Sequence, residues 1–447
     1  MELSAQSSTD YLIVEAVISS TRNDTQVDIR TLVSEFIIYE HIEKPYLTGK
    51  LSFKEEENIL QDMDFQGGEK LTITIQHLEE TVSANTITKE FLIDKIENVI
   101  RVDERTEFVM LHLIEYHVFD SSGQNISKSY SGSPTSIIKT IIESFLDKEV
   151  LIEGIDDVRG MKVIIPNLNP LEAGAWLNKR ATTSDGLPFF FFSALGVDNL
   201  ILKDLEKMLT QLPINAEQPY IYAPSAGDGG GESIKRYLIQ RYRYESQENL
   251  LKIMRNGHVG AKYVFHDTFR GIPTNVDFDV DNVFKTLITK NALGGENSRY
   301  NHSPEFKIKD KRIGQYNSKV ISQIASSGAY DTVGTTFKSY QDEKTIGGQT
   351  KKINRDSLKE FLVKSPLVIT VKGREFITGD ANYTIGKTIR LRFLDTNPYL
   401  DDQTAKFDLK KSGDYLIMTA KHVFSDEGVS TELMCGRVAS LGVEAEL

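Results

Sequence analysis

Residues 11–120 contain short runs in which apolar and polar side chains alternate, and no helical pattern lies between them. In the clearest run, Leu71, Ile73 and Ile75 alternate with threonines, which is the two-residue period of a strand with one buried face. A longer apolar and aromatic run spans residues 108–119. Clusters of glycine, serine and asparagine separate the runs. Several strands without intervening helices predict an antiparallel barrel or sandwich.

The pattern changes to a helical period after residue 130. Ser133 can cap a helix that begins at Pro134, where the missing proline N–H costs nothing. A second helix is expected to follow Asn169, and residues 189–192 predict a buried strand. Residues 130–225 therefore predict a mixed α/β segment. The apolar side chains expected in the stripes of these two helices and of a third are Ile137, Ile138, Ile141, Ile142, Phe145, Leu146, Leu171, Ala175, Trp176, Leu202, Leu205, Met208 and Leu209.

The glycine-rich residues 227–231 indicate a flexible linker. Further along, residues 270–355 are polar with poor periodicity and are expected to be rich in loops. A short helix is expected near residues 357–363. The runs after the linker that predict strands are 237–244, 250–265, 388–393, 415–424 and 431–440.

The composition is that of a soluble globular protein, with 40% apolar and 26% charged residues, and it excludes wholesale disorder. The 447 residues suggest about two to four domains. No run approaches ~18 uninterrupted apolar residues, so no membrane-spanning helix is expected. Residues 1–10 lack a secretory signal, and Cys435 alone cannot form an intramolecular disulfide. We therefore expect synthesis and folding in a reducing cytoplasm.

Negative charge is concentrated at the start of the chain. The net charge is -12, and residues 1–130 hold 24 acidic and 11 basic residues, or 11 - 24 = -13, which leaves +1 for the rest. An acidic segment repels phosphate, so tight binding of nucleic acid through this part is not expected. A solvated acidic surface is the plainer interpretation of the count.

Two short motifs resemble ligand-binding loops but lack the residues that such loops require. The glycines of 227–231 are followed by Glu232, whereas a phosphate-binding loop needs a lysine there. The acidic stretch 277–282 has Asn282 where a calcium loop needs glycine, and Ile288 where it needs a bidentate glutamate. Apolar residues alternate with the acids of this stretch, which indicates a strand edge instead.

No group of residues has the spacing of a catalytic or metal site. The eight histidines lack the spacing of zinc ligands, and His112 and His117 are predicted to point to opposite faces of one strand. The consecutive glutamates 55–57 and 79–80 are interpreted as solvated rims, and Cys435 as a small core residue. We therefore assign no catalytic, cofactor-binding or metal-binding residue, and we do not expect an enzyme.

One internal similarity links the two ends of the chain. Residues 68–75 and 386–393 each begin with glycine and place apolar residues three, five and seven positions later. Many hairpins begin in this way, so both a duplication and a coincidence are compatible with the pattern.

The order of these segments resembles that of baseplate hub proteins from contractile-tailed bacteriophages, the family of adaptors between tail tube and spike. Those proteins have a strand, a short acidic turn with a proline and an aromatic residue, a Leu-Thr-Gly sequence and a second strand, and residues 37–53 follow this order. Residues 270–355 match no pattern of the family and are interpreted as an insertion. Further segments that resemble the family are residues 67–73, 134–146, 169–180, 189–192 and 413–437.

The resemblance implies a mainly β (α+β) fold with two tube-like antiparallel β-barrel domains, a mixed α/β middle segment and a loop-rich insertion. The expected divisions are a first barrel at 1–128, a middle domain at 129–226, a second barrel at 227–270 plus 356–447, and the insertion at 271–355.

The resemblance also implies a structural role. Three chains would form a pseudo-six-fold ring that joins the hexameric tail tube to the trimeric cell-puncturing spike and forms part of the DNA ejection channel. The implied partners are other copies of the chain, the tail tube protein, the central spike protein and other baseplate proteins. Phage DNA would pass without specific binding, and residues 1–130 would supply acidic side chains to repel it. The implied location is the tail baseplate of the virion, after synthesis in the host cytoplasm.

Two alternatives stay open at this point. The same fold would serve as the hub of a secretion-system or tailocin spike. A tail-associated cell-wall glycan hydrolase would need a pair of carboxylates in contrasting environments, and the sequence contains no identifiable pair.

Overall fold

The computed structural model describes residues 11–20, 22, 24–56, 58–77, 86–104, 106–156, 161–223, 237–245, 249–267, 273–290, 299–300, 306–325, 348–377, 383–394, 407–408, 410–437 and 439–440. Its dominant feature is a 13-stranded sheet that contains strands from both ends of the chain. The fold is mainly β with additional helices, as the sequence predicts. No helix of the described residues is long and apolar enough to cross a membrane.

The N-terminal part contributes seven strands to this sheet, and a short helix, α1 (Ile59–Asp62), follows the fourth. The alternation at Leu71, Ile73 and Ile75 is confirmed, because all three side chains are buried in one core. The run at 108–119 is a strand only as far as Glu115. The seven strands are β1 (Tyr11–Ser19), β2 (Gln26–Asp28), β3 (Val33–His41), β4 (Thr48–Glu55), β5 (Lys70–His77), β6 (Thr86–Arg101) and β7 (Glu107–Glu115).

The C-terminal part contributes the remaining strands of the same sheet. β22 pairs in parallel with β13 and antiparallel with β23. The chain before β14 also pairs with β13, because the Ile239 N–H donates to the Ile221 carbonyl at 2.9 Å. Strand pairing therefore runs from β13 through β22, β23, β24, β21 and β14, and the residues before β14 pair with β13 again. These strands are β13 (Tyr220–Tyr222), β14 (Arg241–Tyr244), β21 (Leu367–Lys372), β22 (Thr388–Phe393), β23 (Gly413–Ser425) and β24 (Gly428–Gly436).

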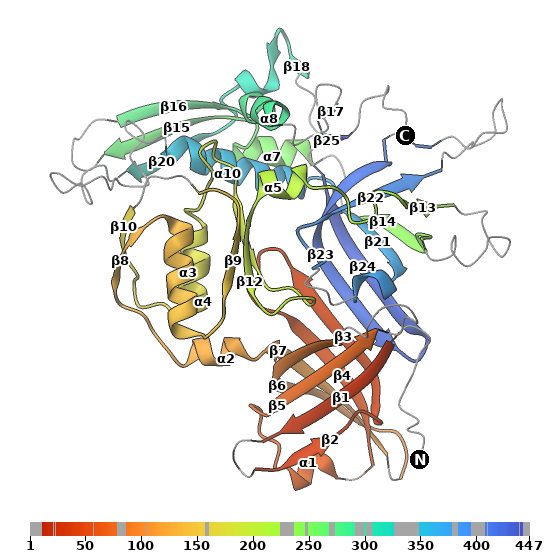
Figure 1. Cartoon of the computed structure of the whole chain (residues 1–447). Coiled ribbons are helices and arrows are strands. Elements are labelled where there is room, and N and C mark those ends of the chain that lie inside the picture. The colour runs from red at the N-terminus through yellow and green to blue at the C-terminus, as the bar shows by residue number, and fades with distance from the viewer. Residues whose placement is uncertain are drawn as a thin grey trace, which may run out of the picture.

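The two parts meet where β23 pairs antiparallel with β3, so that Phe424 lies opposite Phe36. In Figure 1 the blue β23 runs beside the red and orange strands of the N-terminal part. The junction is packed with aromatic rings, since Phe36 stacks on Phe424 at 5.7 Å and Tyr11 meets Phe424 edge-on at 5.2 Å. One core therefore contains side chains from both ends of the chain.

The middle segment has its own core beneath two helices and two small sheets. The helices predicted at Pro134 and Pro170 are confirmed, with Ser133 and Asn169 as their caps. The elements of this segment are α2 (His117–Ser122), β8 (Ser129–Gly132), α3 (Pro134–Phe145), β9 (Val150–Glu153), β10 (Met161–Ile164), α4 (Pro170–Asn178), β11 (Phe189–Phe192), β12 (Leu200–Asp204) and α5 (Leu205–Thr210).

Several local predictions in these segments are wrong. Leu202 lies in β12, and the helix expected to include it begins at Leu205. Residues expected as strand from 250 begin instead as a helix, α7 (Leu250–Asn256). Ala175 is exposed and does not belong to the buried stripe of α4. Trp176 packs against the core of the middle segment, as predicted, but it is only half-buried, and the Arg180 guanidinium lies over its ring at 3.7 Å. Short apolar runs do not distinguish a strand from one helical turn.

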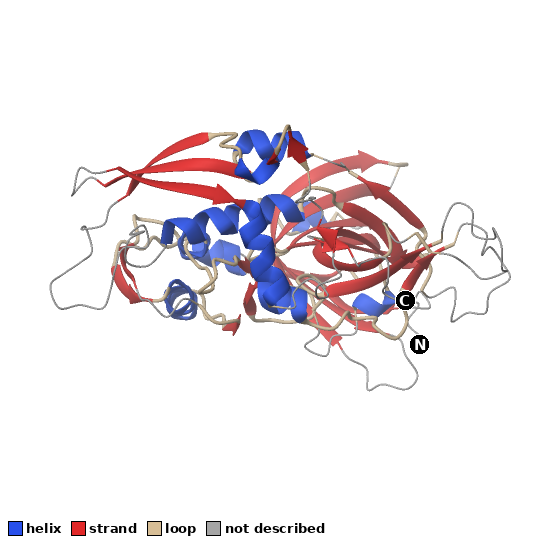
Figure 2. Ribbon diagram, turned by 90° about the horizontal axis from the view of Figure 1, so that it is seen from above, coloured by secondary structure: helices blue, strands red, loops and turns tan. Residues whose placement is uncertain are grey.

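A further layer lies beyond the middle segment, and seen from above it is a small separate sheet next to the helices (Figure 2). Its three strands pair in the order β16, β15, β20. The strand predicted at 250–265 includes most of β15, and the strand edge indicated at 277–282 overlaps the end of β16, whereas β20 was not predicted. The elements of this layer and the remaining short elements of the chain are β15 (Gly260–Asp267), β16 (Pro273–Asp279), α8 (Val280–Thr289), β17 (Arg299–Tyr300), β18 (Lys307–Ile308), β19 (Lys311–Arg312), the 3₁₀ turn Ile313–Gln315, β20 (Val320–Ala325), α10 (Gly348–Leu362), the 3₁₀ turn Arg374–Phe376 and β25 (Ala439–Ser440).

The cap of α4 provides a test of this segment. Asn169 Oδ1 accepts a hydrogen bond from the Glu172 N–H at 2.9 Å and another from the Ser121 hydroxyl at 3.1 Å. Asn169→Ala removes both, and we expect the free energy of unfolding to fall by about 1–2 kcal/mol. Asn169→Asp keeps an acceptor at the helix N-terminus and should cost clearly less. Thermal unfolding followed by circular dichroism checks this, and equal melting for both variants would contradict the capping role.

Candidate functional site

Eight consecutive strands of the large sheet form one wall, in the order β14, β21, β24, β23, β3, β4, β7 and β6. One face of this wall packs on the cores, as Phe36, Ile38 and Glu40 of β3 show by being fully buried. Glu35 and Tyr39 alternate with them and are half-exposed on the other side. We call this second side of the eight strands the open face. It contains strands from both ends of the chain.

The open face carries more cations than carboxylates. Lys50 forms an ion pair with Glu97 at 2.7 Å, and Arg243 lies 3.7 Å from Glu432. The Lys50 ammonium holds the pKa of Glu97 below its usual value through a hydrogen bond. By strand register, the charged residues of the open face are Glu35, Lys50, Lys54, Glu90, Asp94, Lys95, Glu97, Arg241, Arg243, Lys372, Lys421 and Glu432.

The acidic excess of residues 1–130 therefore does not lie on this wall. Of those acids, the open face holds Glu35, Glu90, Asp94 and Glu97. Others are inside the protein, where Glu40, Glu55, Glu69 and Glu115 are each buried. The count of charges along the sequence could not separate interior carboxylates from surface ones, because most of the buried ones have partners distant in sequence.

The wall ends in an unpaired edge on each side. On one side β5 accompanies β6 as far as Leu92, and the Ile93 N–H donates to the Glu69 carbonyl at 2.8 Å. Beyond that point, residues 94–101 pair with β7 on one edge, and no described strand pairs with the other. On the opposite side, residues 237–239 pair with β13, and the following residues 241–244 of β14 pair with β21 alone among the described strands.

The free part of β6 exposes large apolar side chains. Ile96, Val99 and Ile100 are 37%, 47% and 56% exposed, and Val102 beyond the strand is 66% exposed. Ile96 and Val99 lie opposite Leu111 and Val109 of β7, which are fully buried. Their side chains thus continue the core-facing side of the wall past the point where the chain itself covers it. An exposed edge of this kind has free backbone groups with which another strand can pair.

Two buried polar clusters hold the wall together. In the first, Glu40 of β3 accepts from His422 Nε2 of β23 at 2.9 Å and from the Leu195 N–H at 2.6 Å. The Thr431 hydroxyl of β24 lies 3.0 Å from His422 Nδ1. A carboxylate, a histidine and a hydroxyl that are hydrogen-bonded in this order also make up a hydrolytic triad. Here all three residues are buried, so no substrate reaches the hydroxyl and the cluster is structural.

The second cluster joins β6 and β7 to the middle segment. Glu115 accepts from the Leu47 N–H at 2.8 Å and the Ser193 hydroxyl at 2.7 Å, and Lys89 Nζ lies 3.8 Å from its other oxygen. Burial raises the pKa of Glu115, but the charges of His117 and Lys89 and these hydrogen bonds outweigh it and hold the pKa below its usual value. His117 begins α2 and is buried, so the prediction that it shares a strand with His112 is wrong.

A third cluster ties the middle segment to the C-terminal part. Lys203 Nζ lies 2.8 Å from Glu153 and donates to Tyr383 Oη at 2.9 Å, while the Tyr383 hydroxyl donates to Glu153 at 2.6 Å. Burial lowers the pKa of Lys203, with Glu153 opposing it, and burial raises the pKa of Tyr383. Gly154, next to Glu153, has a φ of +145°, and a Cβ there would lie 2.0 Å from Asp204. Only glycine therefore lets Asp204 cap α5.

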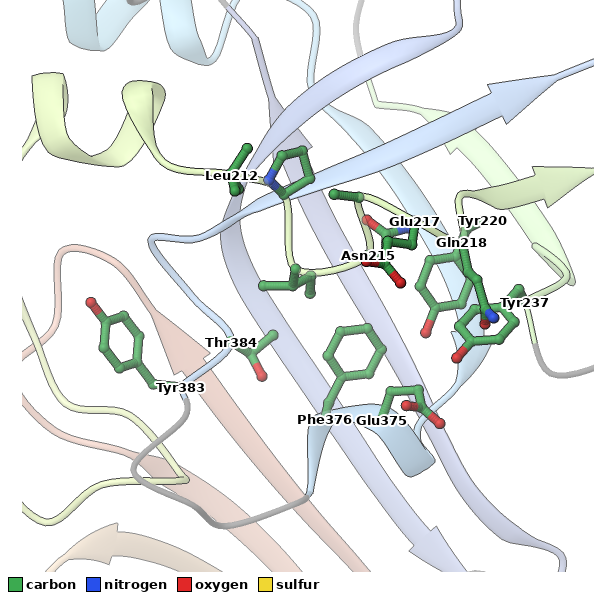
Figure 3. A pocket seen from close by; sticks show the side chains of 13 residues that line it. Leu212, Asn215, Glu217, Gln218, Tyr220, Tyr237, Glu375, Phe376, Tyr383 and Thr384 are labelled. Atoms are coloured by element: carbon green, nitrogen blue, oxygen red, sulfur yellow. The ribbon is translucent and has the colours of Figure 1, made fainter. Parts of the chain in front are cut away.

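A cleft of about 600 Å³ lies beside Tyr383, and Figure 3 shows Tyr220, Tyr237 and Phe376 grouped along it. Its carboxylates come from Glu217, which is exposed, and Glu375, which is half-exposed. A contrasting pair would need one carboxyl buried in an apolar site, and both of these side chains are open to solvent. The cleft thus has an aromatic wall without a contrasting pair of carboxylates.

The residues singled out from the sequence lie apart from one another. Glu55 is buried and accepts from the Ile59 N–H at 3.0 Å, so its interpretation as a solvated rim is wrong. Asp279 of the supposed calcium loop ends β16 and caps α8. Cys435 is buried in β24, where burial raises the pKa of its thiol. Within the described ranges, no group of three or more His, Cys, Asp or Glu side chains could hold a metal.

Some singled-out residues lie outside the described part of the chain. These are the glycines of 227–231, the glutamates 79 and 80, Glu57 and His302. The prediction of a linker at 227–231 stays a prediction.

Comparison with known proteins gives matches in structure alone. No family model and no curated protein sequence matches the chain. The tail protein from Neisseria meningitidis MC58 matches with a TM-score of 0.51 and 11% identity over 96% of this chain and 96% of that one. The 43 kDa tail protein of prophage MuSo2 from Shewanella oneidensis has a TM-score of 0.49 and 13% identity over 95% and 98%. The chain therefore has the fold of the Neisseria tail protein along almost its whole length.

Proposed function

We propose that this chain is a structural subunit of a phage tail baseplate, a hub in which three copies form a ring between the tail tube and the spike. The full-length likeness in fold to a tail protein supports this proposal. The hub is proposed to be non-enzymatic and to reside in the virion tail. Its proposed partners are further copies of itself, the tube protein, the spike protein and other baseplate proteins.

The observation that carries the proposal is the eight-stranded wall. Four of its strands, β3, β4, β7 and β6, come from the N-terminal part, and four, β14, β21, β24 and β23, come from the C-terminal part. A chain with two such four-stranded units offers six of them in a trimer. A trimer with six similar units can match the six-fold symmetry of a tube on one side and the three-fold symmetry of a spike on the other. A joint between a hexameric tube and a trimeric spike requires this match.

The open face is proposed to line the passage. Its charge is mixed, and Lys50 and Arg243 lie close to carboxylates. Carboxylates among the cations weaken the attraction of such a lining for phosphate, so we expect DNA to pass without tight binding. This replaces the acidic lining expected from the charge count.

The mass in solution tests the proposal. Light scattering on the purified protein at high concentration, or with its spike partner, should give three times the chain mass of 50.4 kDa. A strictly monomeric species under both conditions would contradict the ring. Clearing of a peptidoglycan suspension that one Asp or Glu substitution abolishes would contradict the non-enzymatic part.

A further inference from the structure

We infer that the hairpin at residues 306–312 binds the anionic surface of a lipid bilayer, with its apolar side chains at the interface and its lysines among the lipid phosphates. The inference goes beyond the proposed function and does not depend on the ring. The hairpin lies within residues 270–355, the stretch whose sequence matches no pattern of the hub family.

The hairpin projects from the molecule. Its strands β18 and β19 pair antiparallel, with Lys307 opposite Arg312 and Ile308 opposite Lys311. In Figure 1 it stands at the top, beyond α8 and at the end opposite the N-terminal strands. Residues 306–311 are all exposed. A projecting tip of this kind presents its side chains to a flat surface.

Two large apolar side chains are exposed on this tip. Phe306 is 53% and Ile308 46% exposed, and both lie outside the three cores of the described residues. They are two residues apart along one strand, so they point to the same face of the hairpin. Exposed apolar side chains are common singly, and the pair indicates a partner only together with the charges around it.

Lysines surround the apolar pair. Lys307, Lys309 and Lys311 are exposed, and within the described ranges none of their ammonium groups has an ion-pair or hydrogen-bond partner. Lys311 lies opposite Ile308 and shares its face. Residues 305–312 hold four basic and two acidic residues, so the tip is positive although the whole chain carries -12. Charges farther away than the Debye length of ~8 Å are largely screened at physiological salt.

The turn of the hairpin contains a lysine in a conformation that favours glycine. Lys309 has a φ of +57°, and short hairpin turns normally have glycine, asparagine or aspartate at positions of this kind. A lysine there is conformationally less favourable and places an ammonium group at the outermost point of the chain. Strain of this kind is found where a side chain serves a function.

The base of the hairpin is fixed to the protein, and this uses its one arginine. Arg312 lies 2.5 Å from the buried Asp281 and 3.6 Å from Asp279. The Ile313 N–H donates to the Phe306 carbonyl at 2.9 Å, which continues the ladder to the apolar residues. The cations left free at the tip are therefore all lysines, held on a firm support.

This composition favours a bilayer over a protein or a nucleic acid. Protein interfaces are enriched in arginine and depleted of lysine. Lysines beside apolar side chains are typical of segments at a bilayer interface, where the stems lie along the apolar region and the ammonium groups reach phosphates. Nucleic acid would also attract the ammonium groups, but Ile308 offers no ring on which a base could stack.

Co-sedimentation with lipid vesicles tests the inference. The full chain should bind vesicles of equal parts phosphatidylglycerol and phosphatidylcholine, and bind phosphatidylcholine vesicles much less. Replacing Lys307, Lys309 and Lys311 together with glutamine should lower the partition coefficient about a hundredfold, because each lysine near an anionic surface contributes about fivefold. Phe306→Ser should lower it about fivefold, since only half of the ring is still open to burial.

A matched control separates the hairpin from the charge of the whole chain. Lys54→Gln, Lys179→Gln and Lys252→Gln together make the same change of charge at exposed positions on β4, at the end of α4 and on α7. This variant should bind anionic vesicles within about twofold of the natural chain, because distant charges are screened. Unchanged thermal melting without vesicles controls for the folding of every variant.

Tryptophan fluorescence reports insertion directly. The chain has one tryptophan, so Phe306→Trp combined with Trp176→Phe moves the only indole to the tip. Its emission should shift to shorter wavelength on anionic vesicles, and brominated acyl chains should quench it. Neither change is expected from a hairpin that touches only lipid headgroups or another protein.

The outcomes separate this inference from the proposed function. A natural chain that binds no anionic vesicles, whether monomeric or assembled, would overturn the inference, and so would binding that survives loss of the three hairpin lysines. Binding without the emission shift that duplex DNA displaces would overturn it in favour of nucleic acid. Vesicle binding through the hairpin by a chain that never assembles would support it and contradict the proposed ring.

Discussion

Replacing Glu115 with alanine is expected to lower the free energy of unfolding by about 3–5 kcal/mol. The carboxylate is buried with Lys89, and its removal leaves the ammonium group inside the protein with one carbonyl contact, to Val197. It also removes the acceptor of the Leu47 N–H and the Ser193 hydroxyl. Urea unfolding followed by tryptophan fluorescence and circular dichroism measures the loss. Glu90→Ala, at a surface pair with Lys70 one residue from Lys89, is the control and should cost under about 1 kcal/mol.

The same carboxylate predicts a dependence on pH. Its pKa in the folded protein is held below the ordinary value, so its contribution to stability is present above the pKa of an unfolded glutamate, about 4.3. That contribution is lost as the pH falls through the lower folded pKa. The free energy of unfolding of the natural chain should therefore decrease with acid more steeply than that of Glu115→Gln. Parallel curves for the two proteins would show that Glu115 is not responsible.

Replacing Glu40 with alanine is the second substitution with a large expected effect, again about 3–5 kcal/mol. Glu40 is the point at which β3, β23 and Leu195 are joined by hydrogen bonds within the buried junction. Its loss leaves His422 Nε2 and the Leu195 N–H without their acceptor in a site closed to water. Because the junction unites the two ends of the chain, hydrogen exchange should accelerate in β3 and β23 together.

Glu35→Ala is the matched control for Glu40, because it lies on the same strand but on the open face. We expect a change within about 0.5 kcal/mol. If the two substitutions cost the same, the difference between buried and open sides of the wall would not govern stability as argued here.

The sequence predicted those features that depend on neighbours a few residues away. The strand at Leu71, Ile73 and Ile75, and the helices capped by Ser133 and Asn169, follow from local period and cap chemistry. The all-buried strand Phe189–Phe192 was equally visible, because four consecutive phenylalanines cannot form a solvated element.

The features that depend on distant partners were not predictable. Glu40 and His422 are separated by 382 residues, and nothing near either one in the sequence indicates the other. The buried role of Glu55 depends on the short helix that follows it, which has no amphipathic pattern. The open face exists only because β23 pairs with β3, and residues so far apart in the sequence give no sign of this pairing. The candidate surface could therefore not be predicted from the sequence.

The similarity of residues 68–75 and 386–393 has a structural counterpart at their starts. Gly68 and Gly386 have φ angles of +96° and +71°, a region that favours glycine, and each lies two residues before the first residue of a strand. The two strands differ in their pairing, since β5 lies between β1 and β6 while β22 lies between β13 and β23. Duplication stays a prediction from the sequence pattern.

The alternating direction of the eight strands limits how this wall can change during evolution. Adding or deleting one strand would leave both end strands of the wall running the same way, and in a ring whose copies meet through these strands each joint would then become parallel, with different hydrogen-bond geometry. Adding or deleting a hairpin changes the number of strands by two. It keeps the relative direction of the end strands and changes only the width of the passage that the ring would surround. Relatives of differing bore are thus expected to differ by an even number of strands.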